Sequence, residues 1–159
     1  MSLRVRPAGP DDAPLILGFI RDLAAYERLS HEVEATEADI RRDLFGDAPR
    51  ALCDIAEVDG APVGFALWFH NYSTFRGRAG IYLEDLFVRP EARGLGAGKA
   101  LLRRLAQRCV EGGLGRLEWS VLDWNAPSIA FYDSLGAQAM SEWTVRRLDG
   151  AALAALAAD

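Results

Sequence analysis

Three glycines at positions 94, 96 and 98 stand between an apolar run that ends at Val88 and an amphipathic run that begins near Ala100. Backbone NH groups at the start of a helix have no partner within the helix, and the helix dipole makes that end positive. Glycine lets an anion approach these groups without obstruction by side chains. The stretch therefore predicts a strand, a phosphate-binding turn and a helix, in that order.

Two common phosphate-binding motifs do not fit these glycines. A P-loop needs GxxxxGK followed by Ser or Thr, but Arg93 replaces its first glycine and Ala100 its hydroxyl residue. A dinucleotide-binding turn needs GxGxxG near the first strand and an acidic residue at the end of the next strand. Here the pattern is GxGxG, deep in the chain, and Glu111 ends a helical run. The pattern RxxGxG, formed by Arg93, Gly96 and Gly98, fits and suits a pyrophosphate.

Hydrophobic periodicity predicts strands and helices along the whole chain. Strands are expected at 3–6, 50–58, 63–70, 79–88, 116–122 and 141–148. Helices are expected at 15–26, between Thr36 and Gly46, at 100–109, between Asn125 and Gly136, and in the alanine-rich tail after Asp149. Asp59-Gly60 predicts a hairpin turn. This order, without a linker or repeat, predicts a single α/β (α+β) domain over residues 1–159.

Composition narrows the possible partners and location. The formal charge of −5 and the lack of a basic cluster argue against nucleic acid and favour a cationic substrate. The N-terminus MSLRVRPAGPDD has no apolar signal region, and no run reaches the roughly 20 apolar residues of a membrane span. Cys53, Cys109, His31 and His70 lack metal-ligand spacing, so we expect no metal and two buried thiols in a reducing compartment. A cytoplasmic protein that binds no membrane is expected.

Several stretches resemble the GNAT N-acetyltransferases. YLEDLFVRPEARGLGAG followed by an amphipathic helix resembles their acetyl-CoA-binding motif. LAAYERLSHEVEATEADI, GFALWFHNYSTF, IYLEDLFV and DWNAPSIAFYDSLGA resemble the spermidine/spermine (diamine) N-acetyltransferase branch and its thialysine acetyltransferase relatives. The resemblance runs in order from about Arg4 to Ala157. It implies a mixed central sheet of about six to seven strands, about four flanking helices and a short C-terminal helix.

The resemblance also implies which residues hold acetyl-CoA, the cosubstrate. Main chain at Leu86, Phe87 and Val88 is expected to pair with the pantetheine. The pyrophosphate is expected to contact Arg93, Gly94, Leu95, Gly96, Ala97 and Gly98. Asn125 and Tyr132 are expected to contact the cosubstrate from the helix that Asn125 caps.

Glu84 and Asp85 interrupt an otherwise apolar run, where buried carboxylates are costly unless paired or used. Neighbours on a regular strand point to opposite faces, so both reach one site only where a β-bulge re-aims one of them. Pairing of one acid with a buried arginine is the structural alternative. The resemblance implies that both acids contact a cationic acceptor and that Glu84 acts as a base. A carboxylate with a pKa near 4 is poorly matched to an ammonium near 10, so a water relay or prior deprotonation is expected.

Two further stretches supply candidate site residues. Tyr26 and Glu27, in AYE on the first helix, match an acceptor-binding position of these relatives, although Glu27 also fits a solvated helical acid. The phenol of Tyr132, in FYDSLG, can protonate a departing thiolate. The resemblance implies this general-acid role, and a core aromatic is the alternative.

The expected activity is acetyl transfer from acetyl-CoA to a primary amine of a small cationic metabolite: a polyamine, a diamine or a thialysine-like amino acid. Segment 71–80 departs from the polyamine enzymes and is more basic. Two alternatives stay open, namely a protein or peptide amine as acceptor and a catalytically inactive acetyl-CoA-binding sensor. The relatives are mostly homodimers, and the apolar tail is compatible with a homodimer.

Overall fold

The computed structural model describes residues 1–158, whose contacts form two compact units, the first of residues 1–122 and the second starting at residue 123. The first unit contains β1 (Leu3–Pro7), α1 (Ala13–Tyr26), α2 (Glu37–Phe45), β2 (Leu52–Val58), β3 (Ala61–Ser73), β4 (Arg78–Val88), α3 (Ala97–Glu111) and β5 (Leu117–Trp119). The second contains α4 (Ala126–Ser134) and α5 (Gly150–Ala158). Short 3-10 turns η1 (Pro10–Asp12), η2 (Ser30–Glu32) and η3 (Pro90–Ala92) precede α1, α2 and α3.

The strands form one mixed sheet in the order β1-β2-β3-β4-β5. The first four strands pair antiparallel, and β5 pairs parallel with β4. Asp59 and Gly60 both have positive φ, 51° and 81°, as a two-residue hairpin turn between β2 and β3 requires. The predicted mixed sheet and the predicted hairpin are both confirmed.

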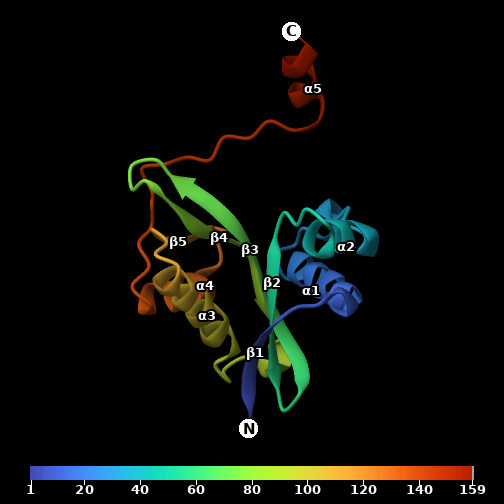
Figure 1. Ribbon diagram of the computed structural model, residues 1–159, viewed down its shortest axis with the longest axis vertical. Coiled ribbons are helices and arrows are strands. Elements are labelled where there is room, and N and C mark those ends of the chain that lie inside the picture. Colours follow the sequence, from blue (N-terminus) through green and yellow to red (C-terminus); the bar gives the residue numbers. More distant parts are fainter. Residues whose placement is uncertain (159) are drawn as a thin grey trace. The chain divides into compact units, whose positions relative to one another are not determined.

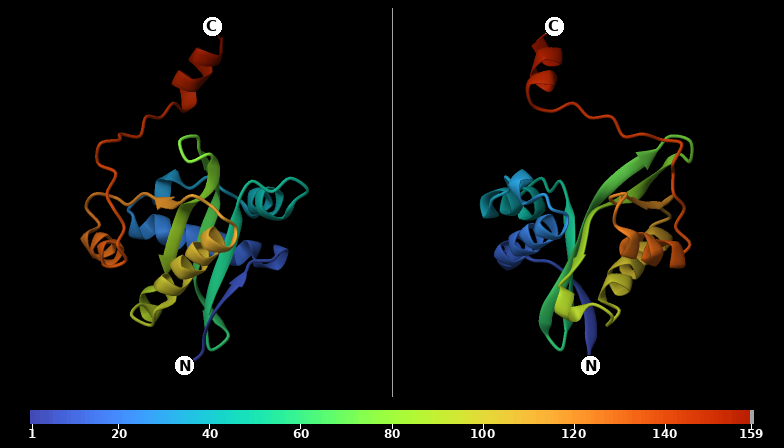
Figure 2. Two further views of the ribbon diagram at one scale, coloured as in Figure 1. Left: turned by 60° about the vertical axis from the view of Figure 1, so that its left-hand side comes forward. Right: turned by 180° about the vertical axis from the view of Figure 1, so that it is seen from behind.

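Helices cover both faces of this sheet. Figures 1 and 2 show α1 and α2 on one face and α3 on the other. On the α1 face the Phe19 ring stacks on the Phe65 ring at a centroid distance of 5.3 Å, and both side chains are fully buried. Ile16 and Ile55 extend this core, and Phe87 on β4 closes it. Packing against α1 thus determines which side chains of β4, Phe87 among them, point toward that helix.

Local sequence signals placed several helix starts correctly. The Thr36 side chain accepts a hydrogen bond from the Asp39 NH at 3.2 Å, and the Asp39 carboxylate accepts one from the Thr36 NH at 2.9 Å. This confirms the predicted capping box of α2. The Asn125 side chain accepts from the Ser128 NH at 3.4 Å, which confirms the predicted cap of α4.

Residues 141–148 form no strand, so this prediction is wrong. Trp143 and Val145 alternate with polar residues as in a strand, but they are 78% and 82% exposed. A strand needs a neighbour to accept its main-chain hydrogen bonds, and within residues 1–158 no strand pairs with this segment. The described sheet therefore has five strands rather than six or seven.

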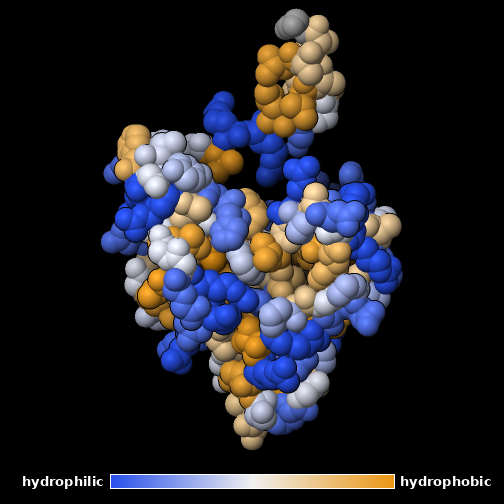
Figure 3. All heavy atoms as spheres, viewed as in Figure 1, coloured by the Kyte–Doolittle hydropathy of each residue, from blue (hydrophilic) through white to orange (hydrophobic). Residues whose placement is uncertain are grey.

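Two other segments follow paths that the sequence left open. Most of segment 71–80 continues the β3–β4 hairpin, whose tip is residues 74–77 with Phe75 wholly exposed. The alanine-rich tail forms α5, and Figure 3 shows its apolar surface, to which Leu153 and Leu156 contribute. No helix within residues 1–158 is both long and apolar enough to cross a membrane.

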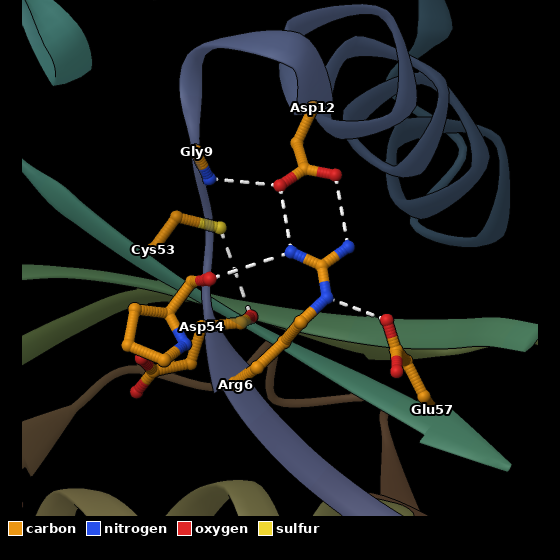
Figure 4. A network of polar contacts seen from close by, with 7 residues as sticks. Arg6, Gly9, Asp12, Cys53, Asp54 and Glu57 are labelled. Atoms are coloured by element: carbon orange, nitrogen blue, oxygen red, sulfur yellow. Dashed lines mark hydrogen bonds and ion pairs between the residues drawn. The ribbon is translucent and has the colours of Figure 1, made fainter. Parts of the chain in front are cut away.

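A buried ion pair joins α3 to the sheet. Asp54 on β2 is 1% exposed and accepts two hydrogen bonds from the guanidinium of Arg108 on α3. The same guanidinium lies 5.1 Å from the centre of the Trp68 ring on β3. On the other face, Arg6 donates hydrogen bonds to Asp12 and Glu57 (Figure 4), and Arg6 holds the pKa of Asp12 below its usual range.

We predict that Arg108→Leu lowers the free energy of unfolding by about 3 kcal/mol in urea denaturation, because it leaves the Asp54 carboxylate buried without a partner. The double variant Asp54→Val/Arg108→Leu should recover most of this loss, since no uncompensated charge remains.

Arg104→Leu is the matched control on α3, since Arg104 pairs with the exposed Glu111 at 3.6 Å. It should change stability by less than about 1 kcal/mol. A loss in Arg108→Leu no larger than in this control would contradict the role given to the buried pair.

Candidate active site

A β-bulge lies at Glu84 in the middle of β4. Leu67 on β3 pairs with Asp85 and the next residue, Trp68, pairs with Leu83, so Glu84 is an extra residue without a partner on β3. A bulge of this kind turns two neighbouring side chains toward the same face. The structure thus meets the condition under which Glu84 and Asp85 can serve one site.

Three carboxylates gather at this bulge. Asp85 lies two residues before Phe87 and opposite Leu67, so it points into the layer between the sheet and α1. Glu27 caps the end of α1, and its charge and that of Glu84 both act on Asp85. The three side chains are not arranged to hold a metal ion, and no such group occurs elsewhere in residues 1–158.

Burial and repulsion both act on the protonation of this cluster. The pKa of Asp85 is raised to about 7, first by burial and then by the charges of Glu84 and Glu27. Burial also raises the pKa of Glu27. Among residues 1–158 no arginine pairs with Asp85, so the structural alternative of a buried ion pair applies to Asp54 and not to Asp85.

The edge of β4 is open beyond the bulge. β5 pairs with β4 only at Ile81, Tyr82 and Leu83, and no strand of the described chain continues this pairing along residues 84–88. Main-chain groups on that side of Leu86 to Val88 therefore lack a strand partner. An extended amide-bearing chain such as pantetheine fits such an edge, because it can replace the missing strand.

The glycine turn follows directly after this edge. Gly94 and Gly96 have φ of 81° and 90°, a region that favours glycine, and a Cβ at Gly94 would meet only open space. Gly96 stands at the N-cap of α3 and provides no side-chain cap. Within the described chain, the first NH groups of α3, at residues 97–99, have no hydrogen-bond acceptor. The turn fits a pyrophosphate, which would accept from these groups.

Arg93 connects the turn to α1. Its Nε donates to the Val88 carbonyl at 3.1 Å, and its guanidinium lies 5.0 Å from the centre of the Tyr26 ring and 5.7 Å from that of Phe87. Arg93, Tyr26 and Phe87 line a groove of about 520 Å³ together with Asp22, Ala25, Arg89, Pro90 and Glu91. The side chain of Arg93 is thus directed to α1, and its main-chain NH donates to the Pro90 carbonyl at 3.3 Å.

Asn125 and Tyr132 belong to the second unit, on α4. They are seven residues apart, which is two helical turns, so they lie along the same side of this helix. The Tyr132 ring is partly buried and lies 5.6 Å from the Phe131 ring. The structure thus places the three acids, the open edge at residues 86–88 and the glycine turn one after another along β4. Asn125 and Tyr132 form a separate pair on α4.

Sequence reasoning missed one property of the acids. It treated Glu84 and Asp85 alike as carboxylates in a buried run, but Glu84 is exposed and Asp85 is partly buried. The spacing between Asp85 and Phe87 was the available signal, because residues two apart on a strand share a face and Phe87 belongs to the core.

We predict that Asp85→Asn raises the free energy of unfolding at pH 8 by about 2 kcal/mol, because it removes a partly buried negative charge. This figure is smaller than the raised pKa alone would give, since solvent screens part of the charge. The pKa of Asp85 is higher in the folded protein than in the unfolded chain. The stability that protonated Asp85 contributes to the parent is therefore complete below pH 4 and is lost as pH rises through about 7. At pH 4 the variant and the parent should therefore unfold alike.

Urea denaturation at the two pH values measures this difference. Glu84→Gln is the control at the neighbouring exposed acid and should gain less at pH 8. The same gain in Asp85→Asn at both pH values would contradict the raised pKa of Asp85.

The chain is similar to known proteins over most of its length. The chain is 40% identical to thialysine N-epsilon-acetyltransferase of Bos taurus, with 96% of each chain covered. It is 33% identical to L-ornithine N5-acetyltransferase NATA1 of Arabidopsis thaliana, with 98% of this chain and 88% of that protein covered. The solved structure of an integron cassette protein from V. cholerae is similar over 100% of this chain and 99% of that chain, with a TM-score of 0.83 and 25% identity.

The sequence pattern of the Acetyltransferase (GNAT) family matches residues 18–137. This range includes the acids at the bulge, the glycine turn and α4. The chain therefore belongs to the GNAT family of acetyltransferases, and the thialysine acetyltransferases that its sequence motifs resemble are among its relatives.

Proposed function

We propose that residues 1–159 act as one acetyltransferase domain, which transfers acetyl from acetyl-CoA to a primary amine of a small cationic metabolite. The observation that carries this proposal is the acid cluster of Glu27, Glu84 and Asp85 at the start of the open β4 edge. A positively charged acceptor and an extended donor would meet at the bulge.

The donor side uses main chain more than side chains. Leu86, Phe87 and Val88 would pair with the pantetheine, and residues 93–98 would hold the pyrophosphate at the N-terminus of α3. Asn125 would contact the cosubstrate from α4. Acetyl-CoA supplies an activated acyl group, so the protein has to position it and manage the protons of the amine.

The acceptor side is acidic and partly desolvated. Tyr26 and Glu27 from α1 and Glu84 and Asp85 from β4 would bind the ammonium group, whose charge offsets the repulsion within the cluster. The bovine and Arabidopsis relatives are named for thialysine and L-ornithine. Both are amino acids with a primary amine at the end of the side chain, and polyamines and diamines present the same group.

Tyr132 would act as the general acid. A phenol with an ordinary pKa near 10 can give its proton to the departing thiolate and regain one from solvent. Support comes from its place on the side of α4 that also carries Asn125.

Partner and location are proposals of the same kind. The exposed apolar side chains of the second unit, among them Met140, Trp143, Val145 and Leu148, suit a homodimer contact. The net charge of −5 argues against a nucleic-acid partner. The free thiols of Cys53 and Cys109 suit a reducing compartment such as the cytoplasm.

A panel of amines tests the function. With acetyl-CoA, we expect release of free thiol with ornithine, lysine analogues, diamines or polyamines at rates at least tenfold above those for neutral amines. A peptide that outcompetes these amines at equal concentration would favour a protein acceptor. Binding of acetyl-CoA without turnover of any amine would favour a sensor.

We predict that Tyr132→Phe lowers the rate of thiol release at least severalfold and leaves the Kd for acetyl-CoA unchanged, because only the proton donor is removed. Phe131→Leu is the control at the neighbouring ring and should retain most of the activity. Undiminished turnover in Tyr132→Phe would exclude Tyr132 as the acid.

A further inference from the structure

The bulge separates the two acids of β4 by their surroundings. Glu84 is the extra residue and is exposed to solvent. Asp85 pairs with Leu67 and shares the face of Phe87, so its carboxylate enters the apolar layer under α1. Glu84 is therefore in contact with solvent, whereas the neighbouring Asp85 is partly buried among apolar side chains.

The charged groups that act on Asp85 come from β4 and from the end of α1. Glu84 on β4 and Glu27 at the end of α1 both raise its pKa. Burial raises the pKa of the Cys53 thiol on β2, and the charges of Asp54, Asp12 and Asp85 raise it further. No cation of residues 1–158 offsets these acids at Asp85.

The buried Asp54 shows what a structural acid looks like on this sheet. Its two oxygens are both bound by Arg108, and it is 1% exposed. Asp85 accepts no hydrogen bond within the described chain, and neither of its oxygens is sealed from solvent. A carboxylate that is partly buried, unpaired and accessible has the features of a reacting group.

We propose that Asp85, rather than Glu84, takes the proton from the ammonium group of the acceptor. This inference rests on the proposed function and reassigns the base that the sequence motif suggests. In this assignment Glu84 and Glu27 bind the acceptor, and their negative charges increase the proton affinity of Asp85.

The proton balance of the step is complete. Asp85 takes one proton from R–NH₃⁺, and the neutral nitrogen forms a C–N bond to the acetyl carbon as the C–S bond breaks. The nitrogen loses a second proton, which balances the one that the general acid gives to the thiolate sulfur. Asp85 then releases its proton to water, so the products are R–NH–acetyl, the free thiol and one H⁺.

A base with a pKa of about 7 suits this task better than an ordinary aspartate. Transfer from an ammonium near 10 to a group near 4 is unfavourable by about six powers of ten, and to a group near 7 by about three. The carboxylate form of Asp85 also still exists at neutral pH. Activity should therefore rise as pH rises through about 7.

The pH dependence of kcat/KM at saturating acetyl-CoA tests the assignment with the best amine of the panel. The parent should show an acidic limb near pH 7. Asp85→Asn should lose this limb and lower kcat by about 100-fold. Glu84→Gln should keep the limb but move it to lower pH, because one negative neighbour of Asp85 is gone.

A second acceptor separates proton transfer from binding. With a primary amine that is already neutral at the assay pH, Asp85→Asn should lose less than about fivefold, since no proton has to be removed first. Asp85→Glu keeps a carboxylate and should restore part of the limb. Persistence of the limb in Asp85→Asn, its loss in Glu84→Gln, or an equal loss with both kinds of amine would overturn the proposal.

A titration of the Asp85 carboxyl group tests the proposal without any measurement of turnover. The carboxyl carbon of Asp85, assigned by its absence in Asp85→Asn, can be followed by carbon-13 NMR across pH. A midpoint near 7 supports the proposal and a midpoint near 4 overturns it. Absence of turnover with every amine would contradict the proposed function, and this titration would still decide the state of Asp85.

Discussion

The antiparallel pairing of β3 with β4 is the constraint on which the site depends. It is the longest ladder of the sheet, and it accommodates one extra residue, Glu84. If Glu84 were paired regularly with β3 instead of bulged, Leu83 and Asp85 would share a face, so either the apolar packing against α3 or the acid facing α1 would be lost. One extra residue in the register thus lets β4 contribute to the packing on both faces and to the acid cluster.

Asp54 and Asp85 both point inward from this sheet, but the charges around them differ. Asp54 is neutralised by Arg108, and the pair joins a helix to the sheet at the cost of removing two ions from water. Within residues 1–158 the charged groups that act on Asp85 are both acids, and burial together with these charges raises its pKa. The first arrangement is structural, and the second has a use only when a cation or a proton arrives.

Much of the fold, including the glycine turn before α3, could be predicted from short-range signals. The capping box at Thr36, the turn at Asp59-Gly60 and the glycine turn before α3 each depend on local backbone chemistry, which a sequence displays. The bulge could be stated only as a condition, because register is set by packing on both faces. Residues 141–148 carry a strand-like pattern but form no strand, since pairing is a property of two segments.

β4 is an interior strand at its first half and an edge at its second. A bare edge invites pairing with another chain, which is a route to aggregation. Here the exposed length is short, with the carboxylates of Glu84 and Asp85 at one end and Pro90, which cannot donate a hydrogen bond, just beyond the other. Charge and proline are the usual means by which proteins protect such edges. The acids at the bulge therefore also help to keep this sheet from joining with its own copies.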